Sequence, residues 1–268
     1  MKSRISRSDI SPCGRDHGRR GNVSSVNDPD PQNTAYSAAL TQGVRDVVAK
    51  ATSTLNRSSL GAMVQDLIAV GDATLTTLAA NDPPAEALAC GEGCAHCCRV
   101  QVHVSIIEAL NIAQGLIDSL VADDLSALKS RIAALDDQTH GMTHKERGVL
   151  ALPCPLLKDE RCSVYDTRPF VCRAANSVDA EQCRVMLTDG ADTQVTSYEH
   201  QKTVYATIGA ATAAGLADGQ QAAGIEAAPG GMVLELAAAL RIALDHADPI
   251  TGWVDGVLDF DPAKARRG

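Results

Sequence analysis

Aromatic residues are scarce in this sequence: Phe, Trp and Tyr make up 3% of its 268 residues, although 45% of the residues are hydrophobic. A core built from this composition must consist mainly of Leu, Ile, Val and Ala side chains. Strands favour aromatic and β-branched residues, whereas Ala and Leu are strong helix formers. The shortage of aromatic residues therefore predicts a mainly α fold.

Long apolar segments are also missing, since no uninterrupted run of about 18 apolar residues is present to cross a bilayer. The N-terminal residues are rich in Ser, Arg and Asp and lack the apolar core of a secretory signal. We therefore expect a cytoplasmic protein with no membrane partner. A net charge of −9 argues against a nucleic-acid partner, because general nucleic-acid binding requires an excess of positive charge.

Two common cofactor motifs do not occur either. The phosphate-loop pattern Gly-x4-Gly-Lys-Ser/Thr is missing, and no Gly-x-Gly-x-x-Gly follows a strand-like segment. The sequence thus gives no support for a nucleotide cofactor. We expect the partner to be a protein or a small molecule, which the sequence does not identify.

Cysteine, by contrast, is abundant and concentrated, because eight of the nine cysteines lie between Cys90 and Cys183. Thiols grouped in this way bind metal, form disulfides or pack as small apolar groups, and a reducing cytoplasm favours metal or redox roles. A Cys-x2-Cys turn is typical of metal-binding knuckles, and glycines let such a turn bend sharply. We therefore take all eight as candidate metal ligands: Cys90, Cys94, Cys97, Cys98, Cys154, Cys162, Cys172 and Cys183.

Apolar periodicity and composition divide the chain into four parts. Residues 1–34 are expected to form a disordered tail, 35–85 a helical hairpin, 86–190 the cysteine-cluster metal-binding region, and 191–262 C-terminal helices that pack on the same domain. Helices are expected over 197–216 and 232–245, with a Gly/Ala-rich link from 215 to 231 between them. The expected fold is mainly α, with helices around an irregular cysteine-rich centre and at most a short hairpin.

Several residues beside the cysteines have two interpretations. Ser105-x-x-Glu108 is a helix capping box, and Glu108 is either that cap or an oxygen ligand or proton carrier beside a metal. His96 is a candidate metal ligand in place of one thiolate. If the centre is catalytic, Glu108, His96 and Tyr165 are the candidate acid–base groups. Arg168 and Arg173 either offset the negative charge of a cluster or form ordinary salt bridges.

These motifs together resemble the bacterial cysteine-cluster family known as YkgJ. The resemblance covers about residues 88–185 and rests on motifs that recur in order: Cys94-x2-Cys97-Cys98, the Ser105-x-x-Glu108 stretch, Cys154-Pro, Cys162-Ser-Val-Tyr and Arg168-Pro-x-x-Cys172-Arg173. The family is described as a zinc- or iron-chelating domain with a Cys-x2-Cys-x2-Cys-Cys signature. Here the first spacing departs, because three residues separate Cys90 from Cys94. The resemblance implies metal binding.

The expected function is therefore a metal-binding protein that holds an iron–sulfur cluster or zinc through cysteine thiolates. Zinc sites usually combine two Cys-x2-Cys pairs, and the second cysteine group here contains none, which favours iron–sulfur. Two alternatives are open. One is an enzyme, either an iron–sulfur oxidoreductase or a protein-modifying enzyme, that uses this centre. The other is a thiol-redox or metal-delivery protein that acts through Cys97 and Cys98.

Overall fold

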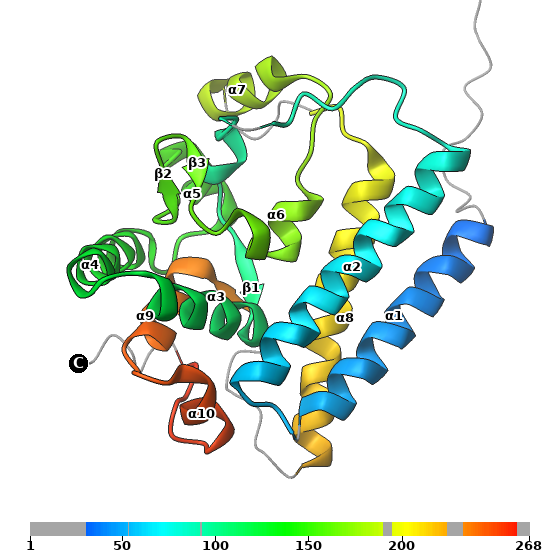
Figure 1. Ribbon diagram of the computed structural model, residues 1–268. Helices are drawn as coiled ribbons and strands as arrows, with labels where there is room; N and C mark the ends of the chain where they lie inside the picture. The colour runs from blue at the N-terminus through cyan, green and yellow to red at the C-terminus, as the bar shows by residue number, and fades with distance from the viewer. Residues whose placement is uncertain (1–30, 53, 92, 190–194, 224–232, 262–268) are drawn as a thin grey trace, which may run out of the picture.

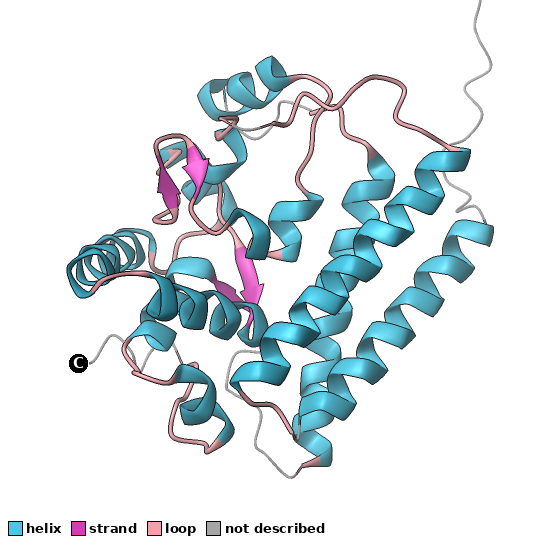
Figure 2. Cartoon of the chain, viewed as in Figure 1, coloured by secondary structure: helices cyan, strands magenta, loops and turns pink. Residues whose placement is uncertain are grey.

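The computed structural model describes residues 31–52, 54–91, 93–189, 195–223 and 233–261 (Figure 1). Within these ranges the chain forms ten α-helices, two 3-10 helices and two small antiparallel sheets of two strands each (Figure 2). The prediction of a mainly α fold is thus confirmed. Most of the tail expected over 1–34 lies outside the described residues.

Three long helices form one side of the molecule (Figure 1): α1 (Pro31–Thr52), α2 (Arg57–Asn81) and α8 (Glu199–Ala222). α8 packs against both α1 and α2. Asn56 begins α2 by accepting hydrogen bonds from the backbone of Ser58 and Ser59. Leu60 of α2 and Ile208 of α8 have no exposed surface, so both helices contribute to the central core.

α8 continues well beyond residue 215, where the sequence predicts a Gly/Ala-rich link. Gly215 and Gly219 lie inside this helix at its contact with α1. A Cβ atom at Gly215 would lie 2.5 Å from the carbonyl oxygen of Arg45, and one at Gly219 would lie 2.7 Å from that of Ala49. The glycines allow close contact between two helix backbones, and the prediction of a link here is wrong over residues 215–222.

The second half of the fold consists of shorter helices around α9 (Leu236–Leu244), a helix in which every residue except Arg241 is buried. α3 (Ile106–Ser119) contacts α9, which also packs against α4 (Ala122–Thr139), while α10 (Pro249–Val254) lies on α3. Ile107, Leu110 and Leu240 have no exposed surface. None of the described helices combines the length and apolarity needed to cross a bilayer.

A short sheet joins two distant parts of the chain. β1 (His103–Ser105) pairs antiparallel with β4 (Val233–Glu235), and Leu236 N extends the contact by donating to Val102 O at 2.8 Å. The helix expected to start near residue 232 therefore begins only at Leu236. This sheet anchors the segment that leaves the first cysteine group to the buried helix α9.

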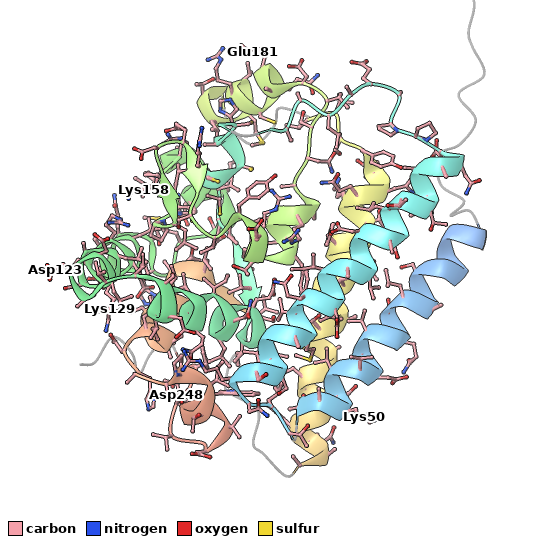
Figure 3. All side chains as sticks on the ribbon, in the orientation of Figure 1. Lys50, Asp123, Lys129, Lys158, Glu181 and Asp248 are labelled. Carbon is pink, nitrogen blue, oxygen red and sulfur yellow. The ribbon has the colours of Figure 1, made fainter. Side chains whose placement is uncertain are left out.

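The eight clustered cysteines lie on short elements and loops. Cysteines are found on η1 (His96–Arg99), on β3 (Arg161–Cys162), which forms a hairpin with β2 (Leu157–Lys158), on α6 (Phe170–Ala174) and on α7 (Ala180–Asp189). Two further short elements, α5 (His144–Leu150) and η2 (Tyr165–Thr167), lie between them in the sequence. Figure 3 labels Lys158 on the hairpin and Glu181 on α7. The expected short hairpin is present, and α6 packs on α8, so the cysteine region is attached to the long helices.

Candidate metal centre

The first cysteine group is held to the loop that precedes α7. Ala89 N donates to Ser177 O at 2.9 Å, and Ser177 N donates to the Cys90 sulfur at 3.2 Å. Between Cys90 and Cys94 the chain turns sharply, with Gly93 at φ 88°, a region that favours glycine. Cys94 N closes the turn by donating to Gly91 O at 3.1 Å. The glycine turn predicted from the sequence is therefore present.

A direct backbone hydrogen bond joins the first and second cysteine groups. Cys154 N donates to Cys98 O at 2.7 Å, which places two cysteines from distant parts of the sequence side by side. Cys154 is followed by the β2–β3 hairpin, in which Cys162 pairs with Leu157. The two-residue turn of that hairpin has positive φ at both positions, 51° at Asp159 and 56° at Glu160. The tight turn returns Cys162 to the same wall as Cys154.

Cys172 is positioned by Glu108, which the sequence predicts to cap α3. One carboxylate oxygen of Glu108 accepts hydrogen bonds from Ser105 N at 2.8 Å and Ser105 Oγ at 2.7 Å. The other accepts from Phe170 N at 2.8 Å, the first residue of α6. A single buried carboxylate therefore caps two helices, and the second of them carries Cys172. Burial raises the pKa of Glu108 even though these donors favour its charged form.

Six of the candidate ligands line one cavity of about 550 Å³: Cys94, Cys97, Cys98, Cys154, Cys162 and Cys172. They come from the loop and η1 of the first group, the segment before the hairpin, the hairpin itself and α6. Val102, Leu156 and Leu236 contribute apolar walls to the same cavity. The folded chain thus brings together thiols that are spread over almost eighty residues of sequence, from Cys94 to Cys172.

Cys90 and Cys183 do not line this cavity, but they lie beside it. The thiols of Cys90 and Cys183 both interact electrostatically with those of Cys94 and Cys97. The Cys90 thiol also interacts with that of Cys183. Ser177 contacts both residues, through its backbone N at Cys90 and through its side chain at Cys183. The eight cysteines therefore form an inner group in the cavity and an outer pair that adjoins it at Cys94. All eight are free thiols.

Burial makes several of these thiols harder to deprotonate than exposed thiols. It raises the pKa of Cys154 to about 11 and raises the pKa values of Cys162 and Cys172 as well. For Cys97 the pKa rises chiefly because of its hydrogen bond with Cys98, and burial adds to that effect. A metal bound by these groups must displace protons, as thiolate ligation generally requires.

Arg147 is a structural residue of the site that the sequence analysis did not identify. Its side chain is 1% exposed, and Nη2 donates to Leu152 O at 3.0 Å while Nη1 reaches Arg99 O at 3.5 Å. These carbonyls flank Cys154 and Cys98, so one guanidinium ties both cysteine segments together. In the sequence Arg147 looks like any charged residue on a short amphipathic helix, and no local signal marks it as buried.

The two arginines that the sequence offers as counter-charges occupy different places. Arg168 lines the cavity, stacks on Tyr165 with its guanidinium carbon 4.1 Å from the ring centre, and counteracts the rise in the pKa of Cys162 that burial causes. Arg173 is buried against α8, with its guanidinium 5.9 Å from the ring centre of Tyr205. Its Nη2 donates to the backbone oxygen of Asp166. Arg168 is therefore the arginine that faces the thiols.

The three acid–base candidates are also separated by the fold. Tyr165 lines the cavity, whereas neither His96 nor Glu108 is among its lining residues. Both carboxylate oxygens of Glu108 are occupied by the backbone and hydroxyl donors described above. Glu108 therefore acts as a cap and not as an open ligand.

The donor set suits thiophilic metals such as zinc and iron, which cysteine thiolates bind in proteins. Within the described ranges, no three His, Cys, Asp or Glu side chains already stand in a closed metal-binding arrangement. The thiols line the cavity walls instead of meeting at one point. Cys94, Cys97, Cys98, Cys154, Cys162 and Cys172 are the residues that would hold a metal centre inside it.

Comparison with known protein families supports metal binding by this region of the chain. Residues 89–201 match the family model "CxxCxxCC: Putative zinc- or iron-chelating domain". The match begins just before Cys90 and ends in the first turn of α8, so it includes all eight clustered cysteines. It confirms the family resemblance seen in the motifs and supports metal binding. No match was found among curated proteins or among solved structures.

Proposed function

We propose that this chain, which carries the zinc- or iron-chelating domain over residues 89–201, holds an iron–sulfur cluster through its cysteine thiolates. The observation that carries the proposal is the single cavity that six thiols from four separate segments line. No other described part of the chain gathers thiols in this way. The family match supports metal binding, and the choice of iron–sulfur over zinc rests on the arguments that follow.

The size and distribution of the thiol-lined cavity favour a centre larger than one ion. Four thiolates around a single zinc, each at about 2.3 Å, bring their sulfur atoms within roughly 4 Å of one another. Here the six thiols are spread along the lining of a cavity of about 550 Å³ and come from four separate segments. A cluster suits such a distribution, because its thiolates bind different iron atoms and therefore lie farther apart.

The chain would supply the surroundings that such a cluster needs. When bound, an iron–sulfur cluster provides one-electron transfer. Arg168 places a positive charge beside Cys97 and Cys162 and offsets part of the negative charge of thiolate ligation. Val102, Leu156 and Leu236 keep water from one side of the cavity. Charge and solvent exposure are two of the properties by which proteins set cluster potentials.

A thiol-exchange function fits the site less well. Reactive cysteines are activated by a lowered pKa, because the thiolate is the nucleophile. Here burial raises the pKa values of Cys154, Cys162 and Cys172, and the hydrogen bond between Cys97 and Cys98 raises that of Cys97. If the centre serves an enzyme, either an oxidoreductase or a protein-modifying enzyme, Tyr165 is the acid–base candidate that lines the cavity.

Metal retention in cysteine variants tests the proposal. Cys154→Ser and Cys172→Ser should each retain less than about half of the iron of the wild type after anaerobic purification, because a serine oxygen is a much weaker ligand of cluster iron than a cysteine thiolate. Cys13→Ser is the matched control, since Cys13 lies outside both the family segment and the described residues. It should retain the full amount.

The readouts are iron, acid-labile sulfide and zinc per chain, measured beside circular dichroism to confirm that each variant folds. Equal metal content in all three variants, or loss from Cys13→Ser alone, would refute cysteine ligation in the cavity. Loss of stoichiometric zinc instead of iron would retain the ligand assignment and refute the cluster.

A further inference from the structure

The cysteine cavity is larger than a metal centre requires. Its volume of about 550 Å³ lies inside the range of roughly 300–1,000 Å³ that is typical of small-molecule sites. A 4Fe–4S cluster has eight atoms, which at roughly 30 Å³ each take up about 240 Å³. A metal centre bound to the thiols would therefore leave space in the cavity, and the residues that border that space indicate what fits there.

The part of the wall that is not cysteine is mainly apolar. Val102 is 6% exposed, Leu156 is 2% exposed and Leu236 is 3% exposed, so these side chains are fixed in the core and present only small faces to the cavity. Val100 and Val164 extend the same lining toward the hairpin and η2. A ligand that fills this space would bury an apolar body, which is stabilised by about 25 cal/mol for each Å² removed from water.

One cation on this wall has an unmet hydrogen bond. The Nε atom of Arg168 is buried without a hydrogen-bond partner, and in the part of the chain that the structure describes the Arg168 guanidinium pairs with no carboxylate. Stacking on Tyr165, at 4.1 Å from the ring centre, holds its plane in place. The acidic residue on the same wall, Glu160, pairs with Arg99 at 3.2 Å. A buried donor without a partner is costly, and a guanidinium matches a carboxylate with two parallel hydrogen bonds.

We propose that the cavity binds a small monocarboxylate with an apolar chain beside the metal centre. Its carboxylate pairs with Arg168, and its chain lies against Val102, Leu156 and Leu236. A chain of about eight carbons suits the space, because about ten non-hydrogen atoms at roughly 30 Å³ each take up about half of the cavity. The inference rests on the proposed function, since it assigns the six thiols that line the cavity to the metal.

The competing role for Arg168 is compensation of thiolate charge alone, because it acts electrostatically on Cys97 and Cys162. The two roles differ in what the loss of the guanidinium affects. A counter-charge of the metal centre changes metal retention when it is removed. A carboxylate anchor changes the binding of an acid and leaves the binding of the neutral analogue unaltered.

The experiment is titration calorimetry of the purified, metal-loaded protein with octanoate, and with 1-octanol as the neutral probe of equal length. Octanoate should bind the wild type at one site per chain and more tightly than 1-octanol. Arg168→Gln should weaken octanoate binding by about ten- to a hundred-fold, the effect expected for the loss of a bidentate charge-assisted pair. Arg168→Lys keeps the charge without the planar fork and should fall between the two.

Arg161→Gln is the matched control, since Arg161 lines the same cavity and its replacement removes one positive charge. It should change octanoate affinity by less than about threefold, the size of a general charge effect at an exposed position. Metal content is measured on each sample, so failure of the metal assignment is read separately from failure of the ligand. If the wild type proves metal-free, the same octanoate series on that protein still tests the anchor.

Binding of octanoate that Arg168→Gln weakens and Arg161→Gln does not, at unchanged metal content, supports the proposal. No saturable octanoate binding to the wild type overturns it. Equal affinity in the wild type and Arg168→Gln overturns it too, as does loss of metal from Arg168→Gln without octanoate binding to the wild type. The last result assigns Arg168 to the metal centre alone.

Discussion

Replacing Glu108 with glutamine should loosen the fold and the cysteine cavity together. Glu108 is buried and accepts from Ser105 N and Oγ on one side and from Phe170 N, at 2.8 Å, on the other. A glutamine side chain has a single acceptor oxygen, so its amide nitrogen must face one of these groups of donors. The start of α3 or the start of α6 then loses its partner, and Cys172 is carried on α6.

The size of the effect follows from the hydrogen bonds. A hydrogen bond to a charged group contributes about 1.5–3 kcal/mol, and a buried N–H without an acceptor costs about 1–3 kcal/mol. Burial raises the pKa of Glu108, so removal of its charge returns part of the desolvation cost. We therefore expect Glu108→Gln to lower the free energy of unfolding by about 2–3 kcal/mol. It should also reduce the metal retained per chain.

The chain contains its own control in a second capping box. Thr143 and Glu146 at the start of α5 repeat the same contacts at 2.7 and 2.8 Å, but Glu146 is exposed and caps only one helix. Glu146→Gln should therefore have a much smaller effect on urea unfolding and none on metal content. The assay is urea denaturation followed by circular dichroism, with metal analysis of the same samples. Equal losses of stability in the two variants would refute the double-cap role of Glu108.

Three further predictions concern helix packing, the buried arginine and proton release. Gly215→Ala should destabilise the protein by about 1–3 kcal/mol in urea denaturation, because the new Cβ would lie 2.5 Å from Arg45 O. Gly43→Ala, in the same helix bundle, is the control. It should stabilise the protein by up to about 1 kcal/mol, because a Cβ at Gly43 would meet nothing within 4 Å. Arg147→Met should lower stability by about 2–4 kcal/mol and metal content with it, because carbonyls beside both cysteine segments lose their donor; unchanged metal content would refute its positioning role. Metal binding should release about one proton per thiol ligated at pH 7, and affinity should rise with pH, because a thiol must lose its proton to bind a metal, as at Cys154, whose pKa burial raises to about 11. Calorimetry in buffers of different ionisation enthalpy measures that release, and a value near zero would contradict thiolate ligation.

Local sequence patterns predicted the cysteine site better than its surroundings. The spacing of Cys94, Cys97 and Cys98 indicated a knuckle, and Ser105-x-x-Glu108 predicted the helix start that the structure contains. Both signals are local, so one segment of sequence carries them completely. The second role of Glu108, as acceptor for Phe170 N, depends on a residue far along the chain and has no local signal.

The features that sequence reasoning missed share this tertiary origin. The pairing of β1 with β4 joins two three-residue strands from opposite halves of the chain, so no local pattern predicts it. Gly215 and Gly219 suggested a link because glycine is unfavourable in helices, but close packing against α1 outweighs that preference. Arg147 is buried only because the carbonyls of Arg99 and Leu152 converge on it.

The central claim, that the clustered thiols hold an iron–sulfur centre, is tested most directly by analysis of the protein purified without oxygen. Iron, zinc and acid-labile sulfide per chain are measured together with the visible spectrum and a thiol titration. We predict brown protein with iron and labile sulfide in about equal amounts, and few thiols that react before the cluster is removed. Folded, colourless protein would contradict the claim, whether it holds stoichiometric zinc instead of iron or no metal at all with clustered thiols that react freely.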